Sequence, residues 1–347
     1  MSVITGKASR TLTSIEICAG AGGSALGIEQ AGFCHLELIE IDRWACETLR
    51  RNRPDWNVTG PSASDHGARD GKPGDIRVFD ATSWRGHVDL LSGGVPCPPF
   101  TIAGRQLGRD DERDLFPEAI RLAHECQPRA IMIENVGGIL GRLFDSYRAE
   151  LLWELGAAGY HLAAWSVVQA SEFGVPQLRP RAVLVAFADP LRALSFRMPR
   201  PMRAAQRSVG VALGDLMAAG GWEGASAWAA RASRIAPTLV GGSKKHGGPD
   251  LGPTRARQQW AALGVDGSRI ADGPPPAGFE GRPQLTVEMA ARLQGFPEWW
   301  RIEGPKTPAY RQVGNAFPPP VSLAIGERLR EALLSAADID DDPELAA

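Results

Sequence analysis

The sequence predicts an α/β fold with a doubly wound and mostly parallel sheet. Short apolar runs alternate with amphipathic helical patterns along the first half of the chain, which is typical of βαβ units. Glycine-rich or acidic segments follow several of these runs, as expected where strands end at a ligand-binding edge. A basic and less regular segment then precedes a final helical pattern, which indicates a second, smaller domain.

The predicted strands are short apolar runs bounded by polar or glycine-rich segments, at residues 14–18, 36–39, 88–91, 130–133, 163–168 and 182–187. Helices are predicted at residues 23–31, 44–52, 115–125, 147–157, 286–293 and 321–334. Gly32 and Gly159 follow two of these helices, at the position where glycine commonly ends a helix. We expect a surface loop at residues 55–74 and almost no regular structure at residues 237–253, where glycine and proline accumulate.

The five cysteines are scattered along the chain and form no CxxC pair or metal-ligand spacing: Cys18, Cys34, Cys46, Cys97 and Cys126. An odd, scattered set is typical of reduced thiols, so we expect neither a disulfide framework nor a metal site. Residues 1–14 lack the apolar region of a signal peptide, and no apolar stretch is long enough to span a bilayer. The sequence therefore predicts a cytoplasmic protein that does not associate with a membrane.

Charge is distributed unevenly along the chain, although the formal net charge is only −2. Residues 191–270 contain twelve lysines and arginines but only four carboxylates. A basic segment beside an acidic remainder suits a protein that holds a polyanion on one face. A solvated basic surface is the alternative that charge alone leaves open.

A proline–cysteine pair lies in a glycine- and proline-rich turn at residues 93–100, directly after a predicted strand. Glu134 follows the end of another predicted strand. In an α/β sheet both segments reach the same edge, so we expect the thiol of Cys97 and the carboxyl group of Glu134 in one pocket. A thiol and an acid there suit nucleophilic attack assisted by proton donation. The alternatives are a buried, inert cysteine and a glutamate held in a structural ion pair.

A second candidate site begins at the glycine turn that follows the first predicted strand, at residues 18–23. Glycines let the backbone approach a ligand closely, and the helix that follows supplies free N–H groups. Glu40 is placed to accept hydrogen bonds from ribose hydroxyls, and Asp75 could face an adenine amino group. The turn lacks the GxGxxG pattern of a dinucleotide site, which disfavours a nicotinamide dehydrogenase. A solvated turn with acids nearby by chance is the remaining alternative.

Taken together, these segments resemble the DNA (cytosine-5)-methyltransferase family. The family's opening cofactor motif, usually DLFAGxGG, is matched by EICAGAGG at residues 16–23, and its nucleophile motif, usually PCQxFS, by PCPPF at residues 96–100. Its ENV motif stands at residues 134–136, its QxRxR motif at residues 177–181, and its two late motifs at residues 292–297 and 312–316. The resemblance covers residues 14–334 except for most of the stretch between Arg181 and Arg292. Six motifs in the family's order are not accidental.

The resemblance implies that Cys97 adds to C6 of cytosine as a thiolate, so that C5 can take a methyl group from S-adenosylmethionine. Glu134 would hold N3 and the exocyclic amine of the base, and Arg181 would reach its O2 while Arg179 packs alongside. The cytosine would have to be flipped out of the duplex. The implied cofactor-binding residues are Cys18, Ala19, Gly20, Ala21, Gly22, Gly23, Glu40, Ile41, Asp75, Ile76, Pro96, Leu115, Asn315 and Ala316.

This chain departs from the family's pattern beside the cofactor. Cys18 stands where the family usually has phenylalanine, and Ile41 where an aromatic residue often follows the ribose-binding acid. Sulfur and aliphatic packing would then replace an aromatic stack on the adenine. Pro98 and Pro99 replace glutamine and a small residue after the nucleophile, which stiffens that turn. None of these exchanges removes a catalytic group.

The basic segment falls where the family places its target-recognition domain. Thr238-Leu239 resembles the pair that begins the family's second recognition loop, and glycines and cations follow it. Cations there can contact phosphates, which carry no sequence information, or guanine edges. The implied DNA-binding residues are Thr238, Leu239, Gly241, Gly242, Ser243, Lys244, Lys245, His246, Arg255 and Arg257.

The implied fold is of the S-adenosylmethionine-dependent methyltransferase type. We expect a catalytic and cofactor-binding domain at residues 1–198, an irregular target-recognition domain at 199–304, a C-terminal element at 305–335 that returns to the catalytic domain, and an acidic tail at 336–347. The predicted function is methylation of cytosine C5 within a short specific sequence of duplex DNA, by a monomer with a cognate restriction endonuclease as a candidate partner. Two alternatives stay open: a transfer RNA cytosine-5 methyltransferase, which the long basic segment disfavours, and a catalytically silent DNA-binding regulator, which the intact catalytic residues disfavour.

Overall fold

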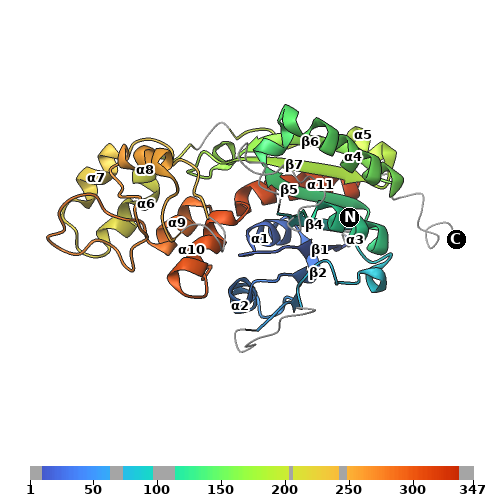
Figure 1. Cartoon of the computed structure of the whole chain (residues 1–347), viewed down its shortest axis with the longest axis horizontal. Helices are drawn as coiled ribbons and strands as arrows, with labels where there is room; N and C mark the ends of the chain where they lie inside the picture. Colours follow the sequence, from blue (N-terminus) through green and yellow to red (C-terminus); the bar gives the residue numbers. More distant parts are fainter. Residues whose placement is uncertain (1–9, 63–72, 97–113, 203–205, 242–247, 336–347) are drawn as a thin grey trace, which may run out of the picture.

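The computed structural model describes residues 10–62, 73–96, 114–202, 206–241 and 248–335. Its centre is a seven-stranded sheet in the order β3-β2-β1-β4-β5-β7-β6 (Figure 1). β7 runs antiparallel to both β5 and β6, and the other neighbouring strands pair in parallel. The predicted doubly wound, mostly parallel sheet is therefore confirmed. The strands are β1 (Leu12–Ile17), β2 (Phe33–Ile39), β3 (Val58–Thr59), β4 (Leu90–Gly94), β5 (Ala130–Val136), β6 (His161–Gln169) and β7 (Pro180–Phe187).

The chain changes direction across the sheet between β1 and β4. From β1 it proceeds through β2 to the edge strand β3, and it then returns to the other side of β1 as β4. The carboxyl ends of β1 and β4 therefore lie side by side, with connections that lead away in opposite directions. This arrangement opens a crevice at the sheet edge, where α/β folds bind their ligands.

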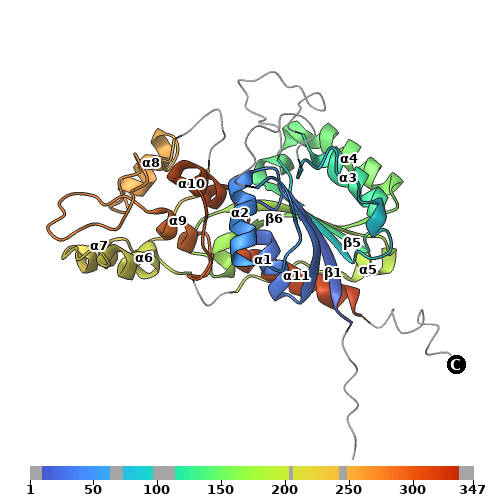
Figure 2. The same cartoon turned by 90° about the horizontal axis from the view of Figure 1, so that it is seen from below.

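Apolar side chains alternate along the central strands, so both faces of the sheet are covered. On β5, Ala130 and Met132 face one layer of core, and Ile131 and Ile133 face the other. The helices of the first layer are α1 (Gly23–Gln30), α5 (Pro190–Ser195) and α11 (Pro319–Leu333), and those of the second are α3 (Phe116–Cys126) and α4 (Asp145–Ala157), as Figure 2 shows.

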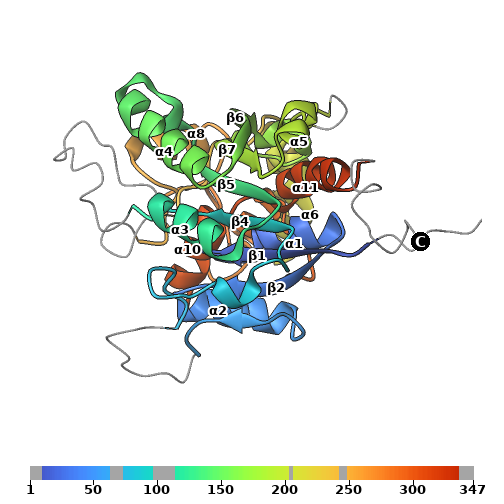
Figure 3. The same cartoon turned by 90° about the vertical axis from the view of Figure 1, so that its right-hand side faces the viewer.

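The last helix, α11, packs closely against the first, α1, and Figure 3 shows the two side by side. A side chain at Gly27 would collide with the Pro319 carbonyl oxygen, 2.5 Å from the Cβ position. At Gly326, a Cβ atom would lie 2.7 Å from that of Ala31. Glycine at both positions lets the two helices approach to backbone contact. The end of the chain is thus part of the layer that covers the sheet.

Four helices in the described part of residues 199–304 lie apart from the sheet, at the left of Figure 1. The sequence predicts only the last of them, so the expectation of an irregular segment is wrong for the other three. All three are short. The burial of α7 and α8 rests mainly on one tryptophan each, Trp228 and Trp260. α6 does carry a short apolar period that the sequence interpretation missed, because Val209, Ala212, Leu213 and Met217 are buried on one face. The four are α6 (Val209–Ala218), α7 (Ala225–Arg231), α8 (Thr254–Ala261) and α9 (Val287–Leu293).

A continuous apolar core joins these helices to the sheet-based part. It runs from Trp228 and Trp260 through Phe296 and Trp300 to Leu49 on α2 (Arg43–Asn52). Hydrogen bonds support the same junction, because Asn52 Nδ2 of α2 donates to the Arg301 carbonyl at 2.7 Å and the Glu303 N–H donates to the Thr48 hydroxyl at 2.9 Å. The Thr48 hydroxyl also donates to Gln312 Oε1 of α10 (Lys306–Asn315) at 2.7 Å. The four helices α6 to α9, which we call the helical lobe, are therefore packed against the sheet-based part and not tethered by a linker alone.

Smaller elements complete the fold. The stretch predicted as a surface loop, residues 55–74, contains β3, which pairs with β2 over two residues and is too short to show a periodic pattern. Within the described ranges, no helix has both the length and the apolar character needed to cross a bilayer. No three His, Cys, Asp or Glu side chains of these ranges gather as a metal site requires. Single-turn 3₁₀ helices lie at Thr82–Trp84, Gly137–Leu140, Arg142–Phe144 and Ala170–Phe173.

Candidate active site

The turn after β1 is held in a left-handed backbone conformation. Cys18, Gly20 and Gly22 have φ angles of 51°, 54° and 80°. Glycine adopts such angles without steric cost, whereas a side chain makes them unusual at Cys18. The Glu40 carboxylate, at the end of β2, accepts hydrogen bonds from the backbone N–H of Gly20 at 2.7 Å and of Asp42 at 2.6 Å. Glu40 therefore ties the ends of β1 and β2 into one rigid edge.

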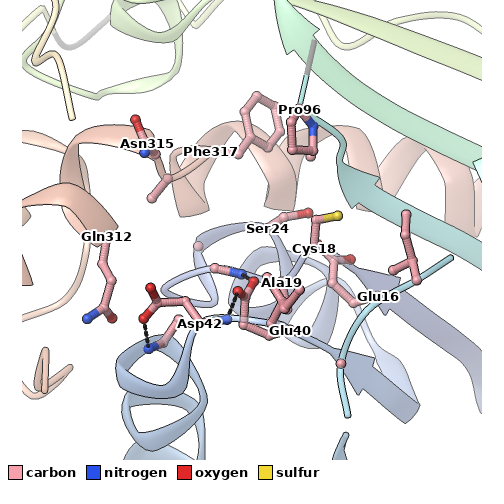
Figure 4. Close-up of a pocket in the computed structure, with 18 of the residues that line it drawn as sticks. Glu16, Cys18, Ala19, Ser24, Glu40, Asp42, Pro96, Gln312, Asn315 and Phe317 are labelled. Carbon is pink, nitrogen blue, oxygen red and sulfur yellow. Dashed lines mark hydrogen bonds between the residues drawn. The ribbon is translucent and has the colours of Figure 1, made fainter. Parts of the chain in front are cut away.

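A cavity of about 270 Å³ opens at this edge of the sheet. Figure 4 shows Glu40 and Asp42 on one side of it, with Asn315 and Phe317 opposite them. One wall comes from the ends of β1, β2, β4 and β5, and the other from α10 and the residues that follow it. The cavity thus lies where the topology predicts a ligand site.

All the predicted cofactor-binding residues line this cavity except Ala21 and Gly22. These two residues contact Trp300 instead. The Trp300 Nε1–H donates to the Ala21 carbonyl at 3.0 Å, and the indole ring lies where a side chain at Gly22 would have to go. Ala21 and Gly22 therefore shape the turn from behind.

The cavity has further lining residues that sequence reasoning missed. Glu16 and Gln312 belong to recognised motifs, so their position in those motifs was the available signal. The approach of α10 to the sheet is a tertiary feature that no local pattern encodes. The residues missed are Glu16, Ser24, Asp42, Ala45, Gly74, Gly94, Pro308, Arg311, Gln312 and Phe317.

Two of the acids at the cavity have contrasting partners. Asp75 pairs with Arg77, with 2.6 Å between Oδ2 and Nη2, so its carboxylate is shared with a cation of its own loop. Glu16 is only 1% exposed, and its Oε2 accepts a hydrogen bond from the Ser92 hydroxyl. Its Oε1 has no hydrogen-bond partner among the described residues. Burial raises the pKa of Glu16 from 4.5 to about 7.

Glu134, at the end of β5, forms an ion pair with Arg181 of β7. The Arg181 Nε and Glu134 Oε1 atoms are 2.8 Å apart, and both side chains are largely buried. Antiparallel pairing sets this geometry, because Val136 of β5 lies opposite Arg181. Burial raises the pKa of Glu134, against the opposing effect of the charges on Arg181 and Arg179. Glu134 lines the cavity. Arg181 is not one of its lining residues and is connected to it by the ion pair with Glu134.

Cys97 lies outside the described residues, but the chain that leads to it is held by Asn135. The Asn135 Nδ2 donates to the Val95 carbonyl at 3.2 Å, and its Oδ1 accepts from the Val136 N–H at 2.7 Å. Pro96, the residue before Cys97, lines the cavity. The ENV motif therefore supplies both an acid to the cavity and an anchor for the segment that carries the thiol.

Arg179, grouped above with the catalytic residues, does not line the cavity. It is fully buried, and its guanidinium donates to the backbone carbonyls of Leu239 at 2.9 Å, Gly314 at 2.7 Å and Ala316 at 3.0 Å. These carbonyls belong to two other segments of the chain. In the structure Arg179 thus contacts these segments rather than the cavity, and we expect it to act on the site by positioning them.

Two buried glutamines extend the contacts of Arg179 into what we call the polar joint. Gln177 donates through Nε2 to Gln294 Oε1 at 2.7 Å and accepts the Leu239 N–H at 2.9 Å. Gln294 in turn donates to the Ala316 carbonyl. The polar joint, made by Gln177, Arg179 and Gln294 with the backbone they bind, connects three of the recognised motifs.

The described DNA-binding candidates divide into packed and exposed residues. The Thr238 hydroxyl donates to the Leu178 carbonyl at 2.6 Å, Leu239 is buried, and Gly241 packs against α10. Arg255 and Arg257 are exposed on α8, and no ion pair joins either to a carboxylate in the described part of the chain. The other candidates lie outside the described residues: Gly242, Ser243, Lys244, Lys245 and His246.

Known proteins resemble this chain over nearly its whole length. A sequence model described as C-5 cytosine-specific DNA methylase matches residues 12–331. The chain is 53% identical over 328 residues to the type II methyltransferase M.NaeI of Lentzea aerocolonigenes, which covers 93% of this chain and 76% of the relative. It is 48% identical over 327 residues to the type II methyltransferase M.NgoMIV of Neisseria gonorrhoeae, with coverages of 92% and 98%.

Solved structures share the fold at much lower identity. The Entamoeba histolytica methyltransferase EhMeth superposes with a TM-score of 0.60 at 14% identity, covering 95% of this chain and 99% of its own. The S. pombe Dnmt2 methyltransferase gives a TM-score of 0.57 at 16% identity, with coverages of 94% and 100%. At such identities, the likeness concerns the fold alone.

Proposed function

The chain belongs to the C-5 cytosine-specific DNA methylase family, and from that premise we propose how its residues carry out the reaction. It is a DNA (cytosine-5)-methyltransferase whose methyl donor is S-adenosylmethionine. We propose that Cys97 is the nucleophile. Its thiolate bonds to C6 of cytosine, and the electron pair displaced to C5 takes up the methyl carbon. Loss of the C5 proton to a base then restores the C5–C6 double bond and expels the thiolate.

The observation that carries this proposal is the placement of Glu134. This glutamate is held by Arg181 at the cavity that Pro96 also lines, and Cys97 is the next residue in the chain. Attack on C6 pushes negative charge toward N3 of the ring. A carboxyl group whose pKa is raised by burial can donate a proton or hydrogen bond to N3 at that moment.

Arg181 orients that carboxyl group through the 2.8 Å contact between Nε and Oε1. A guanidinium stays charged under all relevant conditions, so it can also donate a hydrogen bond to the cytosine O2. We propose this dual role for Arg181, while Arg179 keeps its donors on the polar joint.

The chemistry of the cavity fits S-adenosylmethionine. The carboxylates of Glu40, Asp42 and Asp75 can accept hydrogen bonds from ribose hydroxyls and amino groups. Glu16 adds a buried oxygen without a partner among the described residues, so the acidic lining suits a ligand of net positive charge. Glycine keeps the cradle narrow, because a Cβ at Gly23 would lie 2.2 Å from the Phe317 carbonyl oxygen. When bound, the cofactor supplies a methyl group carried on a positively charged sulfur.

We propose that the substrate is a short specific sequence of duplex DNA and that the target cytosine is flipped out of the helix. A stacked base cannot reach a cavity at the edge of the sheet, so extrusion has to precede attack. The relatives M.NaeI and M.NgoMIV favour DNA over transfer RNA. Both are named type II methyltransferases, and each matches more than nine-tenths of this chain.

We further propose how the chain is divided and with what it works. Residues 1–198 and 305–335 would form the catalytic unit and residues 199–304 the target-recognition unit, while the acidic segment 336–347 lies outside the described residues. We propose a monomer, because one flipped base needs one active site. The bacterial type II relatives support a cytoplasmic enzyme that protects the site of a cognate restriction endonuclease.

Methyl transfer from labelled S-adenosylmethionine tests the proposal directly. Purified protein would be mixed with unmethylated duplex DNA or with transfer RNA, and with Cys97→Ser as the matched control. We expect label as 5-methylcytosine in DNA, abolished by the substitution. Label in transfer RNA alone would overturn the DNA assignment, and DNA binding without transfer to either substrate would favour a silent regulator.

A further inference from the structure

A second large hollow lies in the helical lobe, at a distance from the cofactor cavity in the fold. It is a groove of about 710 Å³. One wall is α8, which contributes Arg255, Gln258 and Gln259, and the other side includes Arg234. No carboxylate is among its lining residues, all of which belong to the described part of the chain. We refer to it as the α8 groove.

The α8 side chains in the groove share one face of the helix. Arg255, Gln258 and Gln259 are spaced by three and four residues, so they project in nearly the same direction. All three are exposed, and none of their side chains makes a hydrogen bond or ion pair with another described residue. The opposite face holds the helix in place through Trp260, which is fully buried. The helix therefore presents free donors and acceptors from a rigid base.

The groove is connected to the active site by packed backbone. Leu178 lines it and stands between Gln177 and Arg179 of the polar joint. The first turn of α8 is anchored as well, because a side chain at Gly252 would touch both Ala256 and Val240. Val240 in turn leads into Gly241, which packs against α10. Whatever occupies the groove is thus held at a fixed position relative to the cavity.

We propose that this face of α8 reads base edges in the major groove of the substrate DNA, with Arg255 contacting a guanine. This inference rests on the proposed function, because it takes duplex DNA as the substrate. The major groove admits an α-helix, and the donor fork of arginine matches the O6 and N7 acceptors of guanine. The amide of glutamine matches the donor and acceptor of adenine in the same way, so Gln258 and Gln259 can read neighbouring pairs.

The neighbouring cation has a different assignment. Arg257 is two residues from Arg255 and therefore projects from another side of α8, and it does not line the groove. A cation outside the groove can contact phosphate, which adds affinity at every sequence alike. The sequence does not distinguish the two arginines, but the helix does. Arg255 is placed to contribute to sequence specificity, and Arg257 to contribute to affinity at every sequence.

The test maps sequence preference in Arg255→Ala and in its matched control Arg257→Ala. Each full-length protein would methylate a duplex library randomised around the target cytosine, and selective binding to the same library would be measured in parallel. For Arg255→Ala we expect the preference for guanine at one position to fall about tenfold. For Arg257→Ala we expect the base preference of the wild type at every position. The slope of the logarithm of the binding constant against the logarithm of the salt concentration should be unchanged or smaller in magnitude by about one.

Arg255→Lys separates charge from shape and guards against a folding defect. It keeps the cation but lacks the planar fork, so the guanine preference should fall while the salt dependence stays. The proposal would be overturned if Arg255→Ala and Arg255→Lys both kept the base preference of the wild type. This holds whether or not the two variants bind all sequences more weakly. An equal change of base preference in Arg257→Ala would overturn it as well. Selective binding by a wild-type protein that transfers no methyl group would instead contradict the proposed function, and the binding profiles would still decide the role of Arg255.

Discussion

Two glutamates at the cavity show how residues of the same type acquire different properties from their surroundings. Glu134 is buried next to two arginines, which keep its charge partly balanced. Glu16 is buried among neutral hydroxyls, with Ser92 donating to its Oε2 and with the charge of Glu134 nearby. Burial raises the pKa of both glutamates. Arg181 and Arg179 oppose this rise at Glu134, whereas no described arginine or lysine opposes it at Glu16. Glu134 is therefore suited to act on a substrate, and Glu16 is suited to stabilise a positively charged ligand.

We expect Glu134→Gln to lower kcat by about a hundredfold or more, because an amide cannot deliver a proton to the ring. The substitution keeps the shape of the side chain, so binding of S-adenosylmethionine should change little. Steady-state methylation and calorimetric titration with the cofactor measure the two effects. An unchanged kcat would contradict the role assigned to Glu134.

The raised pKa of Glu16 predicts a pH-dependent stability. The unfolded chain ionises this group near 4.5 and the folded protein near 7, so its full contribution is present below about pH 4.5 and is lost as the pH rises through about 7. The loss is roughly 3.5 kcal/mol at most, from about 1.4 kcal/mol for each unit of pKa. Glu16→Gln cannot ionise, so its free energy of unfolding relative to wild type should rise between about pH 5 and about pH 8.

Urea unfolding of the two proteins across that range checks this expectation. Glu327→Gln, at an exposed position of α11, is the control and should give parallel curves. A Glu16→Gln curve parallel to wild type would show that Glu16 is not a buried acid in solution.

At the scale of elements, the approach of α10 to the segment that contains Val240 and Gly241 depends on two glycines in contact. A side chain at Gly314 would lie 2.4 Å from the Cα atom of Gly241. We therefore expect Gly314→Ala to lower the free energy of unfolding by about 1–3 kcal/mol, since neither backbone has room to yield. Gly156→Ala on α4 is the control, because no atom lies within 4 Å of its Cβ position. That change should be neutral or should stabilise by about 0.5–1 kcal/mol. Equal effects of the two substitutions would contradict this packing.

Six of the seven strands, and the helices α1, α3, α4 and α11 that cover them, were predictable from their apolar patterns and the segments that end them. The strand β3 and the helix α5 were not, because two and six residues are too few to show a period. Glu40, which directly follows β2, and Glu134, near the end of β5, were predictable in the same way. The helices α7 and α8 were not, because each is buried mainly through one tryptophan, Trp228 or Trp260. The helix α6 does bury apolar residues at helical spacing, and that short pattern was missed. The position of Arg179 was also out of reach, since its partners Leu239 and Gly314 are far away in the sequence. Contacts that close only in three dimensions leave no local pattern.

At the scale of the molecule, the motifs that identify the family do two kinds of work. Some bring groups to the cavity, as the turn after β1 and the ENV motif do. Others fasten the helical lobe to the sheet, as Gln177, Arg179 and Gln294 do through the polar joint. The apolar core that runs from Trp260 to Leu49 makes the same connection. The helical lobe and the cavity are therefore held in a fixed relation.

Capture of a covalent adduct tests the central claim, that Cys97 attacks C6 with Glu134 assisting. A duplex whose target cytosine carries fluorine at C5 would be mixed with the protein and S-adenosylmethionine. Fluorine cannot leave as a proton does, so the thiolate cannot be expelled and the adduct should persist under denaturing electrophoresis. We expect a stable protein–DNA band with wild type, little with Glu134→Gln and none with Cys97→Ser. A band of equal intensity with Cys97→Ser, or methylation of ordinary DNA by that variant, would contradict the claim.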